Sequence, residues 1–272
     1  MKNKQNLHIH STYADGKDQP EAMIQTAIQR GFDSIGFSEH SYMKFSDYPH
    51  QMTVAKMADY RQEIRRLQAQ YADQIEIFCG LEYEMYSEVS TEGMDYIIGS
   101  VHYLDVNGQI VGFDRGLPET LAYIDTHFGG DGMAFSQKYF ETVARLPEKG
   151  KFDIIGHFDL QTKHNEKAKF VDTTAPAYLQ AGYEAIQTLK GQIPFFEVNT
   201  GAISRGYRTT PYPQMEFLRA FKDSGFGAVI TSDCHDRNFI DCYYEEAEEL
   251  LRAAGFRTKW MLTQEGFKEV AL

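Results

Sequence analysis

Cysteine is scarce in this sequence, and long apolar runs are missing. The 272 residues include only three cysteines, Cys79, Cys234 and Cys242, an odd and small number that excludes a disulfide framework. The opening residues, MKNKQNLHIH, lack the apolar stretch of a signal peptide. No segment approaches the roughly eighteen apolar residues of a membrane span. We therefore expect a soluble protein of a reducing compartment, the cytoplasm, with no membrane partner.

Basic residues are also in the minority. Lysine and arginine number 27 against 39 aspartates and glutamates, which gives a formal net charge of −12. This balance argues against a nucleic-acid partner, because such binding depends on Lys and Arg meeting phosphates. A local site can carry the opposite sign from the whole surface, so a small anionic substrate stays compatible with the composition.

The order of apolar runs predicts a single α/β barrel domain over residues 1–272. Hydrophobic residues make up 42% of the chain, enough for a large core. Extended runs alternate with helical ones, a pattern typical of parallel strands joined by helical crossovers. About seven or eight strands favour a closed barrel over an open sheet. Strands are expected at 7–12, 32–40, 75–85, 94–104, 152–160, 194–201, 226–235 and 256–262, and helices at 18–31, 54–73, 136–150, 175–191, 213–225 and 242–255.

The segment LHIHSTYADG, which begins at Leu7, contains the first candidate ligands. If it is extended, His8 and His10 point to the same face, and Asp15 follows shortly before a glycine. Two imidazoles on one face suit a metal ion, whereas the alternative is a surface strand with two incidental histidines. The rest of the chain decides between these interpretations.

Nearly all of the remaining candidate ligands, which are histidines and carboxylates, lie toward the carboxyl ends of the expected strands. In a barrel, the carboxyl ends of the strands carry the active site. Without cations, so many imidazoles and carboxylates on one rim would repel and desolvate one another. We therefore expect two or three divalent ions with room for water. The expected ligands are His8, His10, Asp15, His40, Glu82, His102, His157, Asp233 and His235.

Several other residues that could carry chemistry are left out of this ligand set. Cys234 and Glu39 alternate with ligands along their strands, so we expect both to face away, and Cys234 to pack rather than act as a nucleophile. Gly129 begins a Gly-Gly pair that could flex as a lid, but an ordinary surface turn is the favoured interpretation. The histidines interpreted as solvated surface residues are His50, His127 and His164.

The ordered motifs resemble the polymerase and histidinol phosphatase (PHP) superfamily. The resemblance runs from His8 to His235 and rests on several separate motifs in the right order. It implies a distorted (β/α)7, TIM-like barrel with a trinuclear metal centre. Zn, Mn and Fe all suit such mixed imidazole and carboxylate ligands. The motifs are HIHSTYADG, SEH, GLE, GSVH, GHFDL and SDCH.

The resemblance also implies how the ligands divide among three ions, with Glu82 as a bridge between two of them. The first ion would take His8, His10, Glu82 and Asp233. The second would take Glu82, His102 and His157, and the third would take Asp15, His40 and His235.

Within the superfamily, the segment FFEVNTGAISRGYRTTPYP resembles histidinol-phosphate phosphatases. Arg205 would offer a guanidinium fork to a phosphate oxygen and contact only the phosphate. Ser204 would add a hydroxyl to the substrate site, and Asn199 would hold the substrate or the loop. Lys163 and Arg208 are weaker candidates for the phosphate, because solvated surface charge is the favoured interpretation of both. The residues expected to be catalytic are Asp233, His235 and Arg205.

These inferences predict a metal-dependent phosphomonoester hydrolase of histidine biosynthesis that acts on L-histidinol phosphate. Divalent ions would neutralise the phosphate oxygens and supply hydroxide at neutral pH for in-line attack. The alternative is a PHP phosphatase that acts on phosphotyrosine or another small monoester with the same metal site. A PHP nuclease is less favoured because the chain carries no basic cluster, and a non-catalytic metal-binding domain because no ligand is missing.

Overall fold

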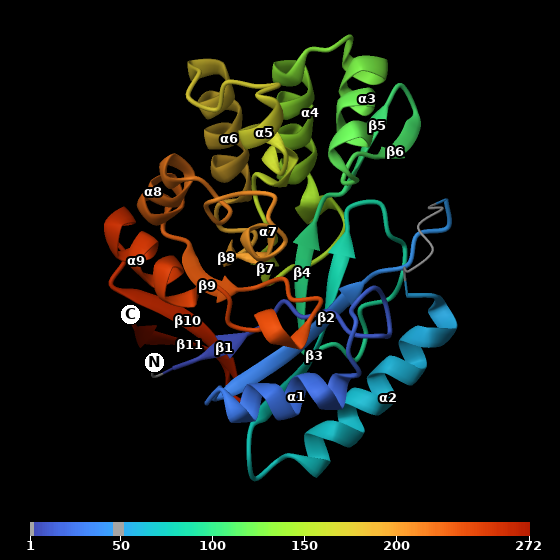
Figure 1. Ribbon diagram of the computed structural model, residues 1–272, viewed down its shortest axis with the longest axis vertical. Helices are drawn as coiled ribbons and strands as arrows, with labels where there is room; N and C mark the ends of the chain where they lie inside the picture. The colour runs from blue at the N-terminus through green and yellow to red at the C-terminus, as the bar shows by residue number, and fades with distance from the viewer. Residues whose placement is uncertain (1–2, 46–51) are drawn as a thin grey trace.

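The computed structural model describes residues 3–45 and 52–272, which form an α/β barrel (Figure 1). Its seven parallel strands follow the order β1-β2-β3-β4-β7-β8-β9, so the strands of the barrel are neighbours in the order in which they occur along the chain. The strands are β1 (Gln5–Asn6), β2 (Ser34–His40), β3 (Glu76–Glu84), β4 (Tyr96–Ser100), β7 (Ile154–Ile155), β8 (Phe195–Asn199) and β9 (Gly227–Thr231).

Backbone contacts between the two edges nearly close this sheet into a barrel. Ile9 and Cys234 form an isolated parallel bridge just beyond the ends of β1 and β9. The amide of His10 donates to the carbonyl of Cys234 at 2.9 Å, and the amide of Cys234 donates to the carbonyl of His8 at 3.0 Å. The expected barrel of parallel strands is therefore confirmed in nearly closed form, although the segment 7–12 contributes a bridge where a regular strand was expected.

Five helices lie where the sequence predicts them, and a sixth, expected at 136–150, begins and ends earlier, at Gly132–Ala144. Their ends carry recognisable signals: Pro20 opens the first helix, and Gly225 and Gly255 end the last two in the left-handed region that favours glycine. Their apolar faces pack on the outside of the barrel and form its larger core. The six are α1 (Pro20–Gln29), α2 (Val54–Gln70), α4 (Gly132–Ala144), α6 (Pro176–Leu189), α8 (Met215–Ser224) and α9 (Tyr244–Ala254).

Other helical elements are not expected from the sequence. The helix α3 (Leu117–Phe128) ends at Gly129, whose φ of 61° marks a left-handed helix cap, so the Gly-Gly pair is a turn, as favoured. None of the described helices is long and apolar enough to cross a membrane. The remaining short elements are α5 (Asn165–Ala168), α7 (Gly201–Ser204) and three 3₁₀ turns at Leu146–Glu148, Leu160–Thr162 and Arg237–Phe239.

The segment 94–104 is divided where one strand was expected. The strand β4 stops at Ser100, and the chain then forms an antiparallel hairpin, β5 (Tyr103–Val106) and β6 (Gln109–Gly112). His102 lies in the break between β4 and β5, which leaves its side chain at the carboxyl edge of the barrel.

A second cluster of buried side chains fills the space inside the barrel. Gly36 and Gly80 make room for the ring of Tyr96, since a Cβ on Gly80 would lie 2.3 Å from that ring. The cluster consists of Leu7, Phe78, Tyr96, Ile98, Ile154, Phe195, Val229 and Leu262.

The expected last strand is β10 (Thr258–Thr263), which contributes Leu262 to this cluster. It pairs with β11 (Gly266–Ala271) and not with the barrel sheet.

Candidate metal centre and active site

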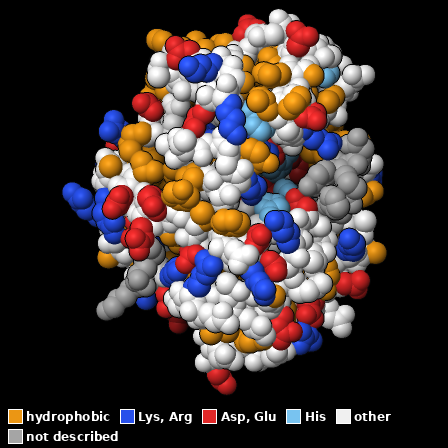
Figure 2. Space-filling view, viewed as in Figure 1, with side chains coloured by type: hydrophobic (Ala, Val, Ile, Leu, Met, Phe, Trp, Pro, Cys, Tyr) orange, Lys and Arg blue, Asp and Glu red, His pale blue; other side chains and the backbone are white. Residues whose placement is uncertain are grey.

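The nine expected ligands all lie at the carboxyl edge of the barrel. Parallel strands end on the same side, so residues that are far apart in the chain meet there. The edge opens into a hollow where the pale blue histidines gather (Figure 2), and this cavity has a volume of about 260 Å³. Seven of the nine line the cavity, and His8 and His10 lie fully buried beneath it.

Glu82, from β3, is at the centre of this cluster. One carboxylate oxygen lies 3.0 Å from His157 Nε2, and the other lies 2.7 Å from His40 Nδ1. The imidazoles of His8, His10 and His102 lie 3.4–3.6 Å from the same carboxylate. Burial disfavours the charged form of Glu82, but the attraction of His40, His8 and His102 outweighs it and holds the pKa well below the usual range. This geometry suits a bridging carboxylate.

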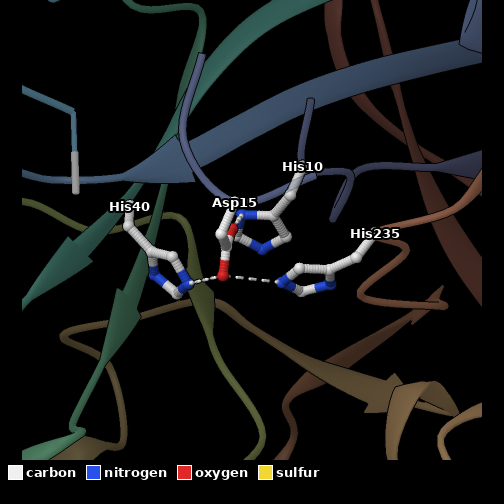
Figure 3. Close-up of side chains that lie close together, drawn as sticks. All are labelled: His10, Asp15, His40 and His235. Carbon is white, nitrogen blue, oxygen red and sulfur yellow. Dashed lines mark hydrogen bonds and ion pairs between the residues drawn. The ribbon is translucent and has the colours of Figure 1, made fainter. Parts of the chain in front are cut away.

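Asp15 draws a second group of ligands together (Figure 3). Its Oδ2 lies 3.2 Å from His235 Nε2 and 3.5 Å from His40 Nε2, and the ring of His10 stacks on that of His235 at 4.2 Å. The loop that carries Asp15 folds back onto His10 because residue 16 is glycine, where a Cβ would lie only 2.3 Å from the carbonyl oxygen of His10.

The buried histidines have nitrogen atoms that lack hydrogen bonds. Nε2 of His8 and Nε2 of His10 are buried and have no hydrogen-bond partner within residues 3–45 and 52–272. Burial, with His235 and His40 nearby, lowers the pKa of His10 to about 3, so this imidazole stays neutral with a lone pair to offer. Unpartnered buried polar atoms are costly, so these residues fit divalent cations.

Three groups of side chains have donor atoms within 4.8 Å of one another. They overlap the implied ion-by-ion assignment without reproducing it, because His10 also joins the Asp15 group and His40 also joins the Glu82 group. The assignment to particular ions stays a prediction. The groups are His10, Asp15, His40 and His235; His8, His10 and Asp233; and His40, Glu82 and His102.

Two carboxylates that support the cluster were missed by the sequence analysis. Glu84 accepts hydrogen bonds from the backbone amide of His102 at 2.8 Å and from its Nδ1 at 3.0 Å. Glu197 lies 2.9 Å from Nδ1 of His8. The signals were present, since Glu84 shares a strand face with Glu82, and Glu197 interrupts the apolar run FFEVN.

Arg205 lines the cavity. The sequence analysis expected its guanidinium to contact only the phosphate, but in the structure it also contacts Asp233. Its guanidinium donates to the carbonyl oxygen of Asp233 at 2.8 Å and to the Asp233 carboxylate at 3.0 Å. Gly201 allows this approach, because a Cβ there would lie 2.8 Å from the Cβ of Asp233. Arg205 therefore also orients an expected metal ligand.

The structure corrects the interpretation of both weaker cationic candidates as solvated surface charges. Lys163 lines the cavity, where its ammonium lies 2.8 Å from Asp114 and 4.8 Å from the centre of the Tyr207 ring. Arg208 is buried, donates to Thr162 and lies over the ring of Tyr212. Lys163 thus stays a candidate for the substrate, whereas Arg208 packs beside the cavity wall.

Asn199 and Ser204 hold the loop and are not among the residues that line the cavity. The amide of Asn199 donates to Glu197 at 2.8 Å, and its oxygen accepts from the backbone of Gly201 at 2.9 Å. The hydroxyl of Ser204 donates to the carbonyl of Gly201 at 2.8 Å. For Asn199 this matches the loop role, and for Ser204 it corrects the expected substrate contact.

The residues left out of the ligand set stay outside the cavity. Cys234 is buried and contributes its thiol to the packing, and burial raises its pKa to about 12. Glu39 is buried and accepts from the amide of Ser11 at 2.9 Å, away from the cavity as expected. His127 is half-buried, and His164 corrects the surface interpretation because it is buried beside the carbonyl of Arg115. His50 lies outside the described residues.

Comparison with known proteins identifies the family. The model of the PHP domain matches residues 6–200. The chain belongs to the PHP family. A Schizosaccharomyces pombe protein named probable histidinol-phosphatase is 30% identical, over 94% of this chain and 88% of its own length. The histidinol-phosphatase of Lactococcus lactis is 32% identical, over 93% of this chain and 92% of its own length.

A solved structure has the same fold as this PHP protein. It is the histidinol phosphate phosphatase of Lactococcus lactis, in complex with Zn, L-histidinol and phosphate. The superposition covers 98% of this chain and 99% of that one, with a TM-score of 0.76 and 20% identity. The distorted PHP-type barrel expected from the sequence is therefore confirmed.

Replacing Cys234 tests the face assigned to it. We expect Cys234→Ser to change kcat/KM less than about threefold, because a buried thiol with a raised pKa is not a nucleophile, and to reduce the free energy of unfolding by about 1 kcal/mol. Phosphate release and urea unfolding measure the two effects. A loss of several orders of magnitude in turnover by a folded variant would mean that the thiol faces the reaction.

Glu82→Gln tests the bridging role. It removes the charge that faces five imidazoles, so metal affinity should fall by more than about a hundredfold, beyond the range typical of supporting residues, and turnover should fall with it. Elemental analysis and phosphate release measure the two. Glu76→Gln, at the other end of the same strand, is the control. Full metal content in folded Glu82→Gln would contradict the role.

Proposed function

We propose that this chain is a metal-dependent phosphomonoester hydrolase that converts L-histidinol phosphate to L-histidinol and phosphate in histidine biosynthesis. The observation that carries the proposal is one cavity in which seven of the nine potential ligands adjoin two cationic side chains, Arg205 and Lys163, with His8 and His10 directly beneath it. The names of the two relatives, and the L-histidinol and phosphate bound in the Lactococcus lactis structure, support this substrate.

The nine side chains would hold two to three divalent ions, with Zn, Mn and Fe all compatible with the donor set. When bound, such ions neutralise phosphate oxygens and lower the pKa of bound water, which makes hydroxide available near neutral pH. The zinc in the Lactococcus lactis structure favours zinc among the three.

The chain's own residues would orient the phosphate around this centre. The guanidinium of Arg205 can offer a phosphate oxygen the N–H groups that do not face Asp233. Burial disfavours the charged form of Asp233, but Arg205 and His8 outweigh it and hold the pKa of this carboxyl well below its usual range, so Asp233 stays an anion. His235, between Asp15 and Arg205, lies at the same wall and completes the proposed catalytic set.

The size and surroundings of the cavity favour a small monoester. A volume of about 260 Å³ suits a small molecule. The net charge of −12 disfavours a nucleic-acid substrate. Lys163 and Tyr207 line the side next to Arg205, where the organic part of the substrate would lie.

We treat residues 1–272 as one domain, because a single barrel sheet and its helices include most of the described chain. The three cysteines are free, which suits the reducing cytoplasm.

A panel of phosphate monoesters tests the substrate. The metal-loaded protein should release phosphate from L-histidinol phosphate with a kcat/KM at least about a hundredfold above that for phosphotyrosine, a difference of roughly 2.7 kcal/mol. A short oligonucleotide should release none. Preference for phosphotyrosine would replace the proposed substrate and keep the phosphatase chemistry.

Arg205 variants test the phosphate contact. Arg205→Ala should reduce kcat/KM by roughly ten- to two-hundredfold, because a charge-assisted hydrogen bond to phosphate contributes on the order of 1.5–3 kcal/mol. Arg205→Lys should recover only part of the loss, because an ammonium lacks the fork. Metal content is measured alongside, since Arg205 also contacts Asp233. Arg219→Ala, an exposed arginine on α8, is the control. Unchanged kcat/KM in Arg205→Ala would exclude the contact.

A further inference from the structure

Glu197 is a fully buried carboxylate in the middle of β8. It is not among the residues that line the cavity, and the expected ligand set does not include it. Both of its oxygens are nevertheless engaged by neighbours from three other parts of the barrel. A buried carboxylate at this depth is costly unless such partners hold it.

Four donors surround this carboxylate. One oxygen accepts from the backbone amide of His157 at 2.7 Å and from the side-chain amide of Asn199 at 2.8 Å. The other accepts from the hydroxyl of Thr231 at 2.8 Å and lies 2.9 Å from Nδ1 of His8. Glu197 therefore joins the segments after β1 and β7 to β8 and β9, directly behind two of the expected ligands.

The hydrogen bonds fix the tautomer of His8. A carboxylate accepts hydrogen bonds and does not donate them, so Nδ1 of His8 must carry the proton that points at Glu197. In the neutral imidazole that metal ligation requires, the lone pair of His8 then lies on Nε2. That atom is buried without a hydrogen-bond partner among the described residues, 3.5 Å from Glu82 and 3.8 Å from Asp233.

We propose that Glu197 is a positioning residue for the metal centre, which holds His8 as the Nδ1–H tautomer with Nε2 turned toward the ions and fixes the backbone of His157 beside it. The inference rests on the proposed metal-dependent function. Carboxylates behind ligating histidines set ring orientation and ligand basicity, and their loss typically weakens metal binding by about 10–100-fold.

A glutamine cannot replace Glu197 even though its shape is nearly the same. The amide has one acceptor oxygen and one NH₂ group. If the oxygen faces His8 and Thr231, the NH₂ group faces the amides of His157 and Asn199; if it is flipped, the NH₂ group faces His8. Either orientation sets donors against donors or forces His8 to move its proton to Nε2, which removes the lone pair from the centre.

Glu197→Gln tests the proposal through zinc affinity, measured by competition with a chromogenic chelator. We expect zinc affinity to fall by about 10–100-fold, and the rise in Tm on zinc addition to shrink accordingly. The control is Glu248→Gln, a buried carboxylate on α9 that pairs with Lys259 at 2.7 Å, far from the cavity. It should lower the Tm of the metal-free and zinc-loaded forms alike and leave zinc affinity unchanged.

The outcomes separate the two proposals. Wild-type zinc affinity in a folded Glu197→Gln variant would overturn the positioning role and leave the proposed function standing. A wild-type chain that binds no divalent ion would overturn the proposed function itself.

Wild-type protein provides a test that does not depend on the folding of the variant. In the zinc-loaded protein, ¹⁵N–¹H correlation spectra should show His8 protonated at Nδ1 and unprotonated at Nε2. The opposite tautomer would overturn the positioning role.

Discussion

The structure depends on one electrostatic constraint: six imidazoles and three carboxylates share the end of a barrel, and the innermost of them are fully buried. Their mutual contacts are short, as between Glu82 and His40 at 2.7 Å, and some nitrogen atoms, such as Nε2 of His10, have no hydrogen-bond partner among the described residues. A cluster of this kind is costly in a protein interior unless cations complete it. The cations that catalysis would use would therefore also stabilise the folded state.

Closure of the barrel and assembly of this cluster depend on the same contacts. The backbone bonds between His8, His10 and Cys234 join the first and last strands, and they set the HxH and DxH segments side by side. Asp233 adopts a φ of +45°, an uncommon conformation for a residue other than glycine, and Arg205 holds its carboxylate and its carbonyl. A change that loosens this seam would therefore disturb the expected metal ligands before it disturbs the outer helices.

The sequence predicts the barrel well, and it predicts which side chains gather at the carboxyl edge, because both follow from local patterns. Short, nearly continuous apolar runs mark the strands, and residues at the end of such a run lie by geometry at the carboxyl edge. Prediction from the sequence fails where contacts between distant parts of the chain decide whether a side chain is buried or where a strand ends. The sequence indicates solvated charges for Lys163 and Arg208. In the structure, Lys163 pairs with Asp114 and Arg208 donates to Thr162, and both partners are distant in the chain. His164 is buried for the same reason. The strand expected through His102 breaks because the hairpin β5–β6 starts there.

Supporting carboxylates are the hardest part of such a site to infer from sequence, and the reason is physical. A ligand near a strand end can be recognised from its position, whereas Glu197 lies within an apolar strand. Three of its four partners, His8, His157 and Thr231, are more than 25 residues away. A charge inside such a run is too costly to be incidental. A carboxylate within a buried apolar strand therefore indicates a neighbouring cation, or a histidine next to it that binds a cation. Glu84, two residues beyond Glu82 and bound to His102, follows the same rule. The sheet thus carries carboxylates of two kinds: expected ligands such as Glu82, and Glu84 and Glu197, which hold histidines in place.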